Sequence, residues 1–153
     1  MTPNAALAHD RQEQAGPVAA ARRTDLPTIE DDTRPFWDAA AEGRFLVKRC
    51  RACGAIHHYP RQFCPSCWSD DVEWVDTTGR ATLYTWSVVY TNDLPPFPER
   101  LPYVAAVVDL EEGPRVMTNI IDCDPADLRI GIDLVVDFRS LTDDITAPVF
   151  RPA

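Results

Sequence analysis

Apolar and polar residues alternate along the second half of the chain, and this period of two predicts β-strands. The clearest case is 103–110, where every second residue from Val104 to Leu110 is apolar. A single helical turn is expected at 124–128, because an aspartate cap is followed by a proline. The other predicted strands cover residues 79–91, 115–121, 134–139 and 145–151. Five short strands with a helical insert between the third and the fourth predict a mainly β protein with a five-stranded Greek-key barrel, the OB-fold.

The strand at 79–91 carries three large aromatic residues, Tyr84, Trp86 and Tyr90, on one face. Exposed aromatic residues on an OB-fold strand can stack on the bases of single-stranded nucleic acid. A groove that follows phosphates also needs interleaved Lys or Arg, and none stands between Tyr84 and Tyr90. We therefore expect these aromatic side chains to lie in the barrel core or in a subunit interface.

Four cysteines in the first half form two Cys-x-x-Cys pairs, Cys50 with Cys53 and Cys64 with Cys67, separated by ten residues. Two pairs at this spacing can place four thiolates around one metal ion, and zinc is the expected ion. Four protein ligands leave no open coordination position, so the zinc should be structural rather than catalytic. Short apolar strands are expected on either side of the pairs, at residues 45–49 and 72–75. This arrangement predicts a zinc ribbon whose folding depends on the metal.

A short helix is expected between the start of the chain and the ribbon. The Asp-Thr pair at 32–33 can cap it, Pro35 suits its first turn and Gly43 suits its end. Phe36 begins an apolar face with helical spacing, and Trp37 lies beside that face. The sequence leaves open whether this face packs on the chain's own ribbon or on another subunit.

Charge is distributed unevenly along the chain. There are 15 basic and 24 acidic residues, and the formal net charge of −9 argues against nucleic acid as a partner. The segment 44–67 is the opposite, with five basic residues and no acidic one. These cations either offset the thiolates of the metal site or form a surface that faces an anion. No apolar run approaches the roughly 20 residues of a transmembrane helix, so no membrane partner is expected.

The chain shows no common catalytic motif, such as Gly-x-Ser-x-Gly, a P-loop or His-Glu-x-x-His. His57 and His58 stand between the cysteine pairs, where they either lie in a solvated loop or contact a phosphate or a partner. We therefore expect no catalytic residue and no enzyme activity of the chain alone. Two alternatives stay open: a nucleic-acid-binding ribbon and OB module, and a rubredoxin-like electron carrier with iron in place of zinc.

Composition divides the chain into three parts. Residues 1–32 are rich in Ala, Pro, Gln, Asp and Arg and contain no aromatic residue, so a flexible N-terminal segment is expected. The helix and zinc ribbon are predicted for 33–76, and the OB-fold for 77–153. Four of the five cysteines stand in ligand spacing rather than in a disulfide framework, which favours a reducing, cytoplasmic location.

An ordered set of short motifs along residues 33–151 resembles one known family. In chain order the motifs are Pro35-Phe36-Trp37, Cys50-x-x-Cys53-Gly54, Tyr59-Pro60-Arg61 before Cys64-Pro65-x-Cys67, Gly79-x-Ala81-x-Leu83-Tyr84-x-Trp86-Ser87, Pro102-Tyr103-Val104, Leu110-Glu111-Glu112-Gly113 and Leu128-Arg129-Ile130-Gly131. The chain is similar to acyl-CoA-associated proteins that join a rubredoxin-like zinc ribbon to an OB-fold, long catalogued as a domain of unknown function. It departs from them at Ala81 and Trp68, where glycine is frequent.

This resemblance implies an accessory subunit. Members of the family partner thiolase-like enzymes, either aldolases or thiolases, that make or break carbon–carbon bonds next to a coenzyme A thioester. The chemistry would lie on the partner, in steroid side-chain or other acyl-CoA degradation, and this chain would complete the hetero-oligomer. Coenzyme A carries phosphates that favour Arg and Lys. The residues expected to contact the acyl-CoA or the partner are Arg49, Arg51, His57, His58, Arg61, Phe36 and Trp37.

Overall fold

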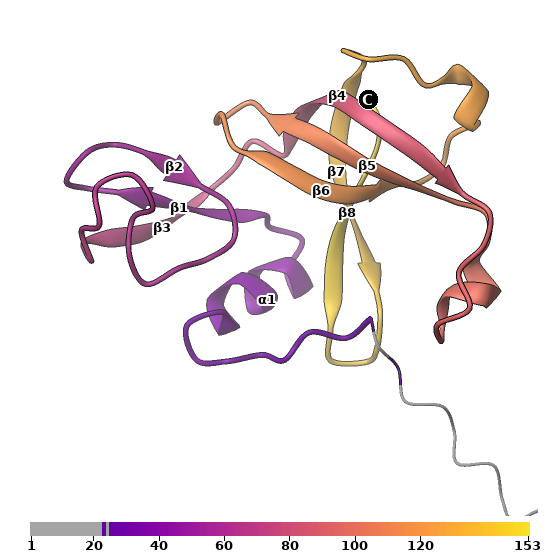
Figure 1. The fold of residues 1–153 in the computed structure, drawn as a ribbon. Helices are drawn as coiled ribbons and strands as arrows, with labels where there is room; N and C mark the ends of the chain where they lie inside the picture. The colour runs from indigo at the N-terminus through magenta and orange to yellow at the C-terminus, as the bar shows by residue number, and fades with distance from the viewer. Residues whose placement is uncertain (1–22, 24) are drawn as a thin grey trace, which may run out of the picture.

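The computed structural model describes Arg23 and residues 25–153. A helix and a small three-stranded ribbon lie beside a closed five-stranded barrel (Figure 1). In chain order the elements are α1 (Arg34–Ala41), β1 (Leu46–Cys50), β2 (Ile56–His57), β3 (Val72–Asp76), β4 (Arg80–Val89), the 3₁₀ helix η1 (Phe97–Arg100), β5 (Tyr103–Leu110), β6 (Arg115–Ile120), the 3₁₀ helix η2 (Pro125–Asp127), β7 (Asp133–Ser140) and β8 (Thr146–Pro152). The flexibility predicted for 1–32 concerns mainly residues 1–22 and 24, which lie outside the described residues, and the three domain boundaries stay predictions.

The barrel closes in the strand order β4-β5-β6-β8-β7. Neighbouring strands are antiparallel except β6 and β8, which pair in parallel at Ile120 and Phe150. Along β5 every second residue is buried, as the alternation predicts, and η2 follows an aspartate whose carboxylate accepts a hydrogen bond from Ala126 N. This is the mainly β architecture with an OB-fold that the sequence predicts, and the prediction is confirmed.

Strand β4 departs from the prediction because its alternation is interrupted. The pairing register with β5 shifts between Leu83 and Thr85, which is a β-bulge at Tyr84. Leu83 therefore points into the core, whereas Tyr84 is 45% exposed and Tyr90 is 73% exposed. The guanidinium of Arg115 lies over the Tyr84 ring, 3.3 Å from its centroid. Neither tyrosine lies in the barrel core: the bulge separates Tyr84 from the inward face that carries Trp86, and Tyr90 follows the last residue of β4. A position of the tyrosines in a subunit interface, the other half of the expectation, stays a prediction. Trp86 is half-buried and packs against the core.

Helix α1 packs on its own chain. Thr33 precedes it, Pro35 lies in its first turn, and the face formed by Phe36, Ala39 and Ala40 is buried. The ring of Phe36 meets Phe45 edge-on at 5.9 Å between centroids. Phe45 meets Phe150 of β8 in the same way at 6.0 Å. A continuous run of aromatic contacts thus joins the helix, the start of the ribbon and the barrel. The apolar face of the helix, whose covering the sequence leaves open, therefore packs within its own chain.

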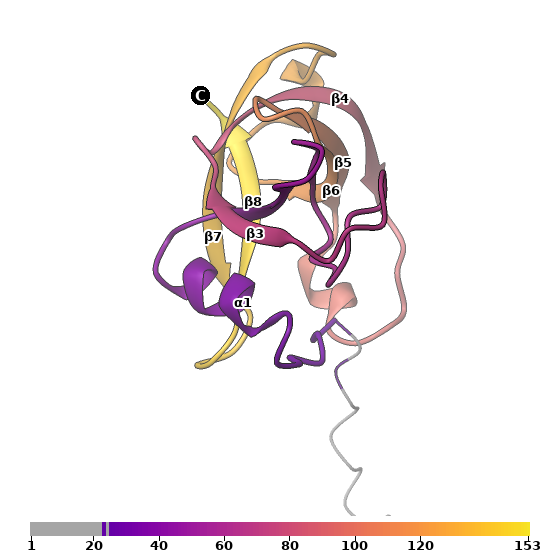
Figure 2. The same ribbon diagram turned by 90° about the vertical axis from the view of Figure 1, so that its left-hand side faces the viewer.

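The ribbon has the strand order β2-β1-β3, and the two-residue strand β2 is not predicted by the sequence. Strands β1 and β3 pair from Leu46 opposite Asp76 to Cys50 opposite Val72. The chain then passes into the barrel through Gly79, whose φ is +74°. A Cβ at this position would lie 2.7 Å from Cγ1 of Val136, so only glycine fits. In the view of Figure 2 the ribbon lies in front of the barrel.

Candidate functional site

The two cysteine pairs meet at the end of the ribbon. The Sγ atoms of Cys50 and Cys67 are 3.6 Å apart, those of Cys53 and Cys64 are 3.7 Å apart, and all four lie within 4.8 Å of one another. In a tetrahedral site with Zn–S bonds of about 2.3 Å, neighbouring sulfurs are about 3.8 Å apart. The four thiols therefore fit one zinc ion.

Two matching turns aim the sulfurs at one point. After the first pair, the N–H of Gly54 donates to the carbonyl of Cys50 at 2.9 Å, and after the second, the N–H of Trp68 donates to the carbonyl of Cys64 at 2.9 Å. Both turns need a positive φ at the donor residue, +77° for Gly54 and +64° for Trp68. Glycine adopts this conformation readily, whereas tryptophan does so at a cost.

The thiols strongly influence one another. Burial raises the pKa of Cys64, but hydrogen bonds from the backbone N–H groups of Cys67 and Ser66 outweigh it and lower the pKa to about 6. At Cys67 a backbone N–H of Ser69 lowers the pKa, yet the crowding of the other sulfurs raises it on balance. Four thiols so close cannot all ionise without a cation, so metal binding must release protons. With four cysteine ligands the site has no open position, and its zinc is structural.

Acidic residues from outside the segment 44–67 neutralise part of its positive charge. Arg51 pairs with Glu73 of β3 at 2.8 Å and with Asp71 at 3.5 Å. Arg44 pairs with Asp76 at 3.0 Å. The exposed Arg49 and Arg61 have no such ion pair with any residue that the structure describes.

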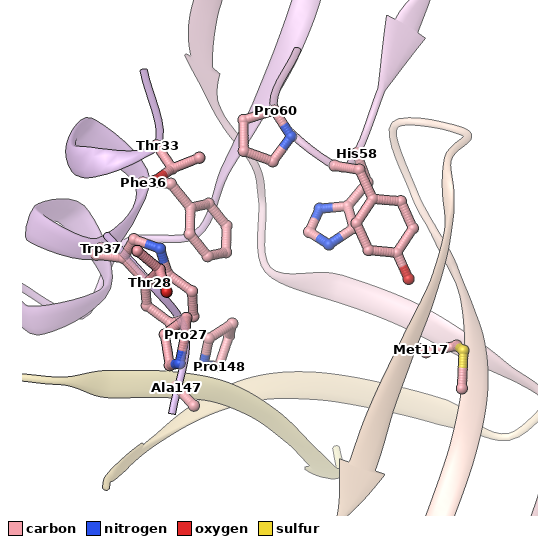
Figure 3. A pocket seen from close by; sticks show the side chains of 11 residues that line it. Pro27, Thr28, Thr33, Phe36, Trp37, His58, Pro60, Met117, Ala147 and Pro148 are labelled. Carbon is pink, nitrogen blue, oxygen red and sulfur yellow. The ribbon is translucent and has the colours of Figure 1, made fainter. Parts of the chain in front are cut away.

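An apolar pocket of about 360 Å³ lies where the helix, the ribbon and the barrel meet (Figure 3). Phe36 and Trp37 of α1 line one side, and His58 lies opposite them (Figure 3). Three of the predicted contact residues therefore come together here; the other four, Arg49, Arg51, His57 and Arg61, do not line the pocket. The remaining walls come from Pro27, Thr28, Thr33, Tyr59, Pro60, Met117, Ala147 and Pro148.

His58 is held as a neutral imidazole in this pocket. Its ring lies 5.8 Å from the Phe36 centroid and 5.5 Å from the Phe45 centroid. Burial, assisted by the neighbouring His57, lowers the pKa of His58 to about 4. Its buried Nδ1 has no hydrogen-bond partner among the described residues, and the same holds for both ring nitrogens of His57. His58 thus carries an unsatisfied buried polar atom beside a pocket whose lining is mostly apolar.

The wall formed by Pro27 and Thr28 is anchored through Asp25, whose side chain is only 6% exposed. Arg23 donates to both of its carboxylate oxygens, at 3.0 and 2.8 Å, and Arg100 donates to one of them at 3.0 Å. The hydrogen bonds from Arg23 hold the pKa of Asp25 below its usual range. Sequence reasoning misses this anchor because Asp25 and Arg100 are far apart in the chain and composition suggests a solvated segment.

The sequence gives only weak indications of the other pocket residues that were not predicted. Tyr59 and Pro60 belong to the motif that precedes the second cysteine pair. Met117 stands at an outward position of β6, and its side chain is exposed. An outward apolar residue is common on any strand, so its position alone could not assign it to a pocket.

A rubredoxin-like zinc ribbon followed by an OB-fold defines the class to which this fold and metal site belong. Residues 37–73 match the description "ChsH2, rubredoxin-like zinc ribbon domain", and residues 74–139 match "ChsH2, C-terminal OB-fold domain". The chain therefore belongs to the ChsH2 family of zinc-ribbon and OB-fold proteins, which confirms the resemblance predicted from the motifs.

Two curated relatives show the range of the family. A DUF35 domain-containing scaffold protein of Methanocaldococcus jannaschii is 36% identical over 97 residues, or 63% of this chain and 68% of that protein. A "Probable enoyl-CoA hydratase alpha subunit" of Thermomonospora curvata is 36% identical over 127 residues, or 83% of this chain. The chain spans only 39% of the length of that second relative.

One solved structure shares both sequence and fold with the chain. It is described as "Ltp2-ChsH2(DUF35) aldolase" and is 35% identical, with a TM-score of 0.74 over 83% of this chain and 98% of the other. Among the residues that the structure describes, no helix is long and apolar enough to cross a membrane.

Proposed function

We propose that this chain is a non-catalytic accessory subunit that binds and supports a thiolase-like enzyme, an aldolase or a thiolase, acting on acyl-CoA thioesters. The observation that carries the proposal is the likeness to a chain of an Ltp2-ChsH2(DUF35) aldolase, which this chain covers to 98%. The closed metal centre supports it, because a zinc ion with four cysteine ligands offers no position to a substrate. The complex would work in the cytoplasm, in steroid side-chain or other acyl-CoA degradation.

The pocket between α1, the ribbon and the barrel supports a role in holding an apolar group. Its volume lies at the lower end of the range for small-molecule sites, and its walls are mostly apolar. Trp37 and His58 would contact an acyl group or an apolar side chain of the partner. Phe36 is buried in the core and would act mainly by fixing the shape of the wall.

The unpaired cations support contact with the phosphates of coenzyme A. Arg61 directly follows Pro60 of the pocket wall and has no acidic partner in the described part of the chain. Arg49 is also unpaired, whereas Arg51 is largely neutralised by Glu73. We therefore assign the phosphate contact first to Arg61, then to Arg49, with Arg51 and His57 as outer contacts of the same surface.

Co-expression with a thiolase-like enzyme from the same genome tests the proposal. We expect one hetero-oligomer on size-exclusion chromatography, and thioester turnover by the enzyme that rises when this chain is present. Arg61→Ala should weaken acyl-CoA binding or assembly, while the matched variant Arg80→Ala on β4 should not. Thioester turnover by the isolated chain, or an enzyme indifferent to its presence, would contradict the proposal.

The two alternatives from the sequence gain no support. The ribbon matches a domain that is described as a zinc ribbon. An electron carrier would hold iron instead, and its preparation would be coloured, whereas a zinc protein is colourless. Arg115 of β6 covers the ring of Tyr84 on β4, which removes one stacking platform from a nucleic-acid surface.

A further inference from the structure

One wall of the pocket beside α1 is held differently from the others. Residues 25–29, which we call the strap, lead from the β7–β8 hairpin to the start of α1 (Figure 1). Pro27 and Thr28 of the strap lie beside Trp37, on the side of the pocket opposite His58 (Figure 3). The strap belongs to no helix or strand, whereas the other walls come from α1, the ribbon and two strands of the barrel.

Hydrogen bonds hold the strap at its two ends and not between them. At the C-terminal end a turn precedes α1, in which the N–H of Thr33 donates to the carbonyl of Glu30 at 3.0 Å. At the other end lies Asp25. Between these points, residues 26–29 form no hydrogen bond with any residue that the structure describes. Segments with few backbone hydrogen bonds open locally at a low cost in free energy, so the position of this wall depends on its ends.

The carboxylate of Asp25 ties its end of the strap to two distant parts of the fold. Arg100 of η1 donates to Oδ2 of Asp25 at 3.0 Å. Arg23 binds both carboxylate oxygens, and its Nη1 also donates to the carbonyl of Leu141 in the turn of the β7–β8 hairpin. A nearly buried carboxylate is stable only while it stays paired. Loss of either Asp25 or Arg100 should therefore release this end of the strap.

The position of the strap limits the space in the pocket. The volume of about 360 Å³ is small for a ligand site, and Pro27 and Thr28 take up part of the space between Trp37 and Pro148 (Figure 3). Both Trp37 and Pro148 are half-buried with the strap in place. Movement of the strap away from them would uncover apolar surface that a longer group could contact.

We propose that Asp25 is a positioning residue, which latches the strap over the pocket, and that the latched strap sets the largest apolar group that the pocket accepts. Arg100 holds the latch from the side of the barrel. This inference rests on the proposed function, which assigns an apolar group to the pocket, and it adds a limit on the size of that group.

Binding of straight-chain carboxylates, from hexanoate to dodecanoate, to the full-length zinc-loaded protein tests this limit. For the wild type, calorimetry should show an affinity that rises about fourfold with each methylene group until the chain fills the pocket, and then stops rising. For Asp25→Ala and Arg100→Ala the rise should continue to longer chains. The ratio of dodecanoate affinity to hexanoate affinity should then increase by about tenfold or more. A variant that only loses stability would bind both ligands less and keep the wild-type ratio.

Asp31→Ala is the matched control. Its carboxylate is fully exposed in the turn before α1, and its ion pair with Arg34 is long, at 3.9 Å. This variant should keep the wild-type ratio. The double variant of Asp25 and Arg100 should match either single variant, because both changes remove the same latch. An unchanged ratio in both single variants, or no carboxylate binding by the wild type and the variants alike, would overturn the proposal. If Asp25→Ala does not fold, Arg100→Ala decides the test.

Assembly with the thiolase-like enzyme is measured separately, by size-exclusion chromatography. An Asp25→Ala chain that assembles normally but keeps the wild-type ratio overturns the latch alone. A wild-type chain that assembles with no such enzyme, while the ratio shifts as expected in the variants, contradicts the proposed function and leaves the latch in place.

Discussion

The metal-held end of the ribbon, residues 51–71, and the barrel are stabilised by different means. Of residues 51–71, Cys64 alone is buried. In contrast, each of the five barrel strands contributes buried side chains to one continuous core. Apart from Ile56 and His58, which pack against the core, the metal-held end therefore has little apolar burial to offset the entropy of folding, and the zinc must supply most of that free energy. The barrel obtains it from the hydrophobic effect. The two regions should lose their structure separately.

Removal of the metal should have the largest effect. Cys64→Ser, or a strong chelator, should abolish zinc binding and remove on the order of 10 kcal/mol of metal-coupled folding free energy from residues 51–71. Hydrogen exchange would show loss of protection in that segment and retained protection in β5, with zinc content measured in parallel. Equal loss of protection in β5 would contradict the separation of the two regions.

A cavity in the barrel should have the converse effect. Leu83 of β4 is 1% exposed, and Leu83→Ala should lower the free energy of unfolding by about 2–5 kcal/mol. Zinc stoichiometry should stay at that of the wild type, because the cysteine pairs do not depend on the barrel core. Chemical denaturation and metal analysis measure the two quantities, and Thr82→Ala, at an exposed neighbouring position, is the control. Loss of zinc from the folded variant would show that the regions are coupled.

The same contrast explains how far the sequence predicts the structure. The zinc site follows from cysteine spacing, and β5 from strict alternation, because each depends on residues close together in the chain. The bulge at Tyr84 could not be predicted, because the sequence pattern runs through this position without an interruption. Strand β2 could not be predicted either, because two residues are too few to show a period. The anchor of Asp25 to Arg100, and the pocket it helps to form, depend on pairs that only the closed barrel brings together.

The junction between the two regions should respond to pH through His58. Its pKa in the folded state is about 4, below the roughly 6.5 of an unfolded chain, so the unfolded state binds more protons between these values. Stability is then complete above about pH 6.5 and falls as the pH drops toward 4, by at most about 3 kcal/mol. His58→Phe should flatten this decline.

Measurement of the unfolding free energy from pH 7.5 to 4 in both proteins, at fixed zinc concentration, isolates this contribution. Loss of zinc in acid affects both proteins alike, so only their difference reports His58. Parallel curves would show that His58 is not responsible for the pH dependence.

The two turns at the metal-held end offer the finest test, because one uses Gly54 and the other Trp68 for the same hydrogen bond. The left-handed conformation costs a non-glycine residue about 1–2 kcal/mol. Trp68 regains part of this by stacking on Phe63, at 5.2 Å between ring centroids, although it remains 74% exposed. Trp68→Gly should therefore stabilise the metal-held end by up to about 1 kcal/mol.

Gly54→Ala is the reciprocal variant. No atom lies within 4 Å of the added Cβ, so its expected cost of about 1 kcal/mol comes from the backbone conformation alone. Competition with a chelator measures both changes as shifts in zinc affinity, upward for Trp68→Gly and downward for Gly54→Ala. A decrease for Trp68→Gly would mean that the aromatic stack outweighs the backbone strain. The exposed tryptophan would then act as a structural part of the second turn, because its contact with Phe63 would be holding that turn in place.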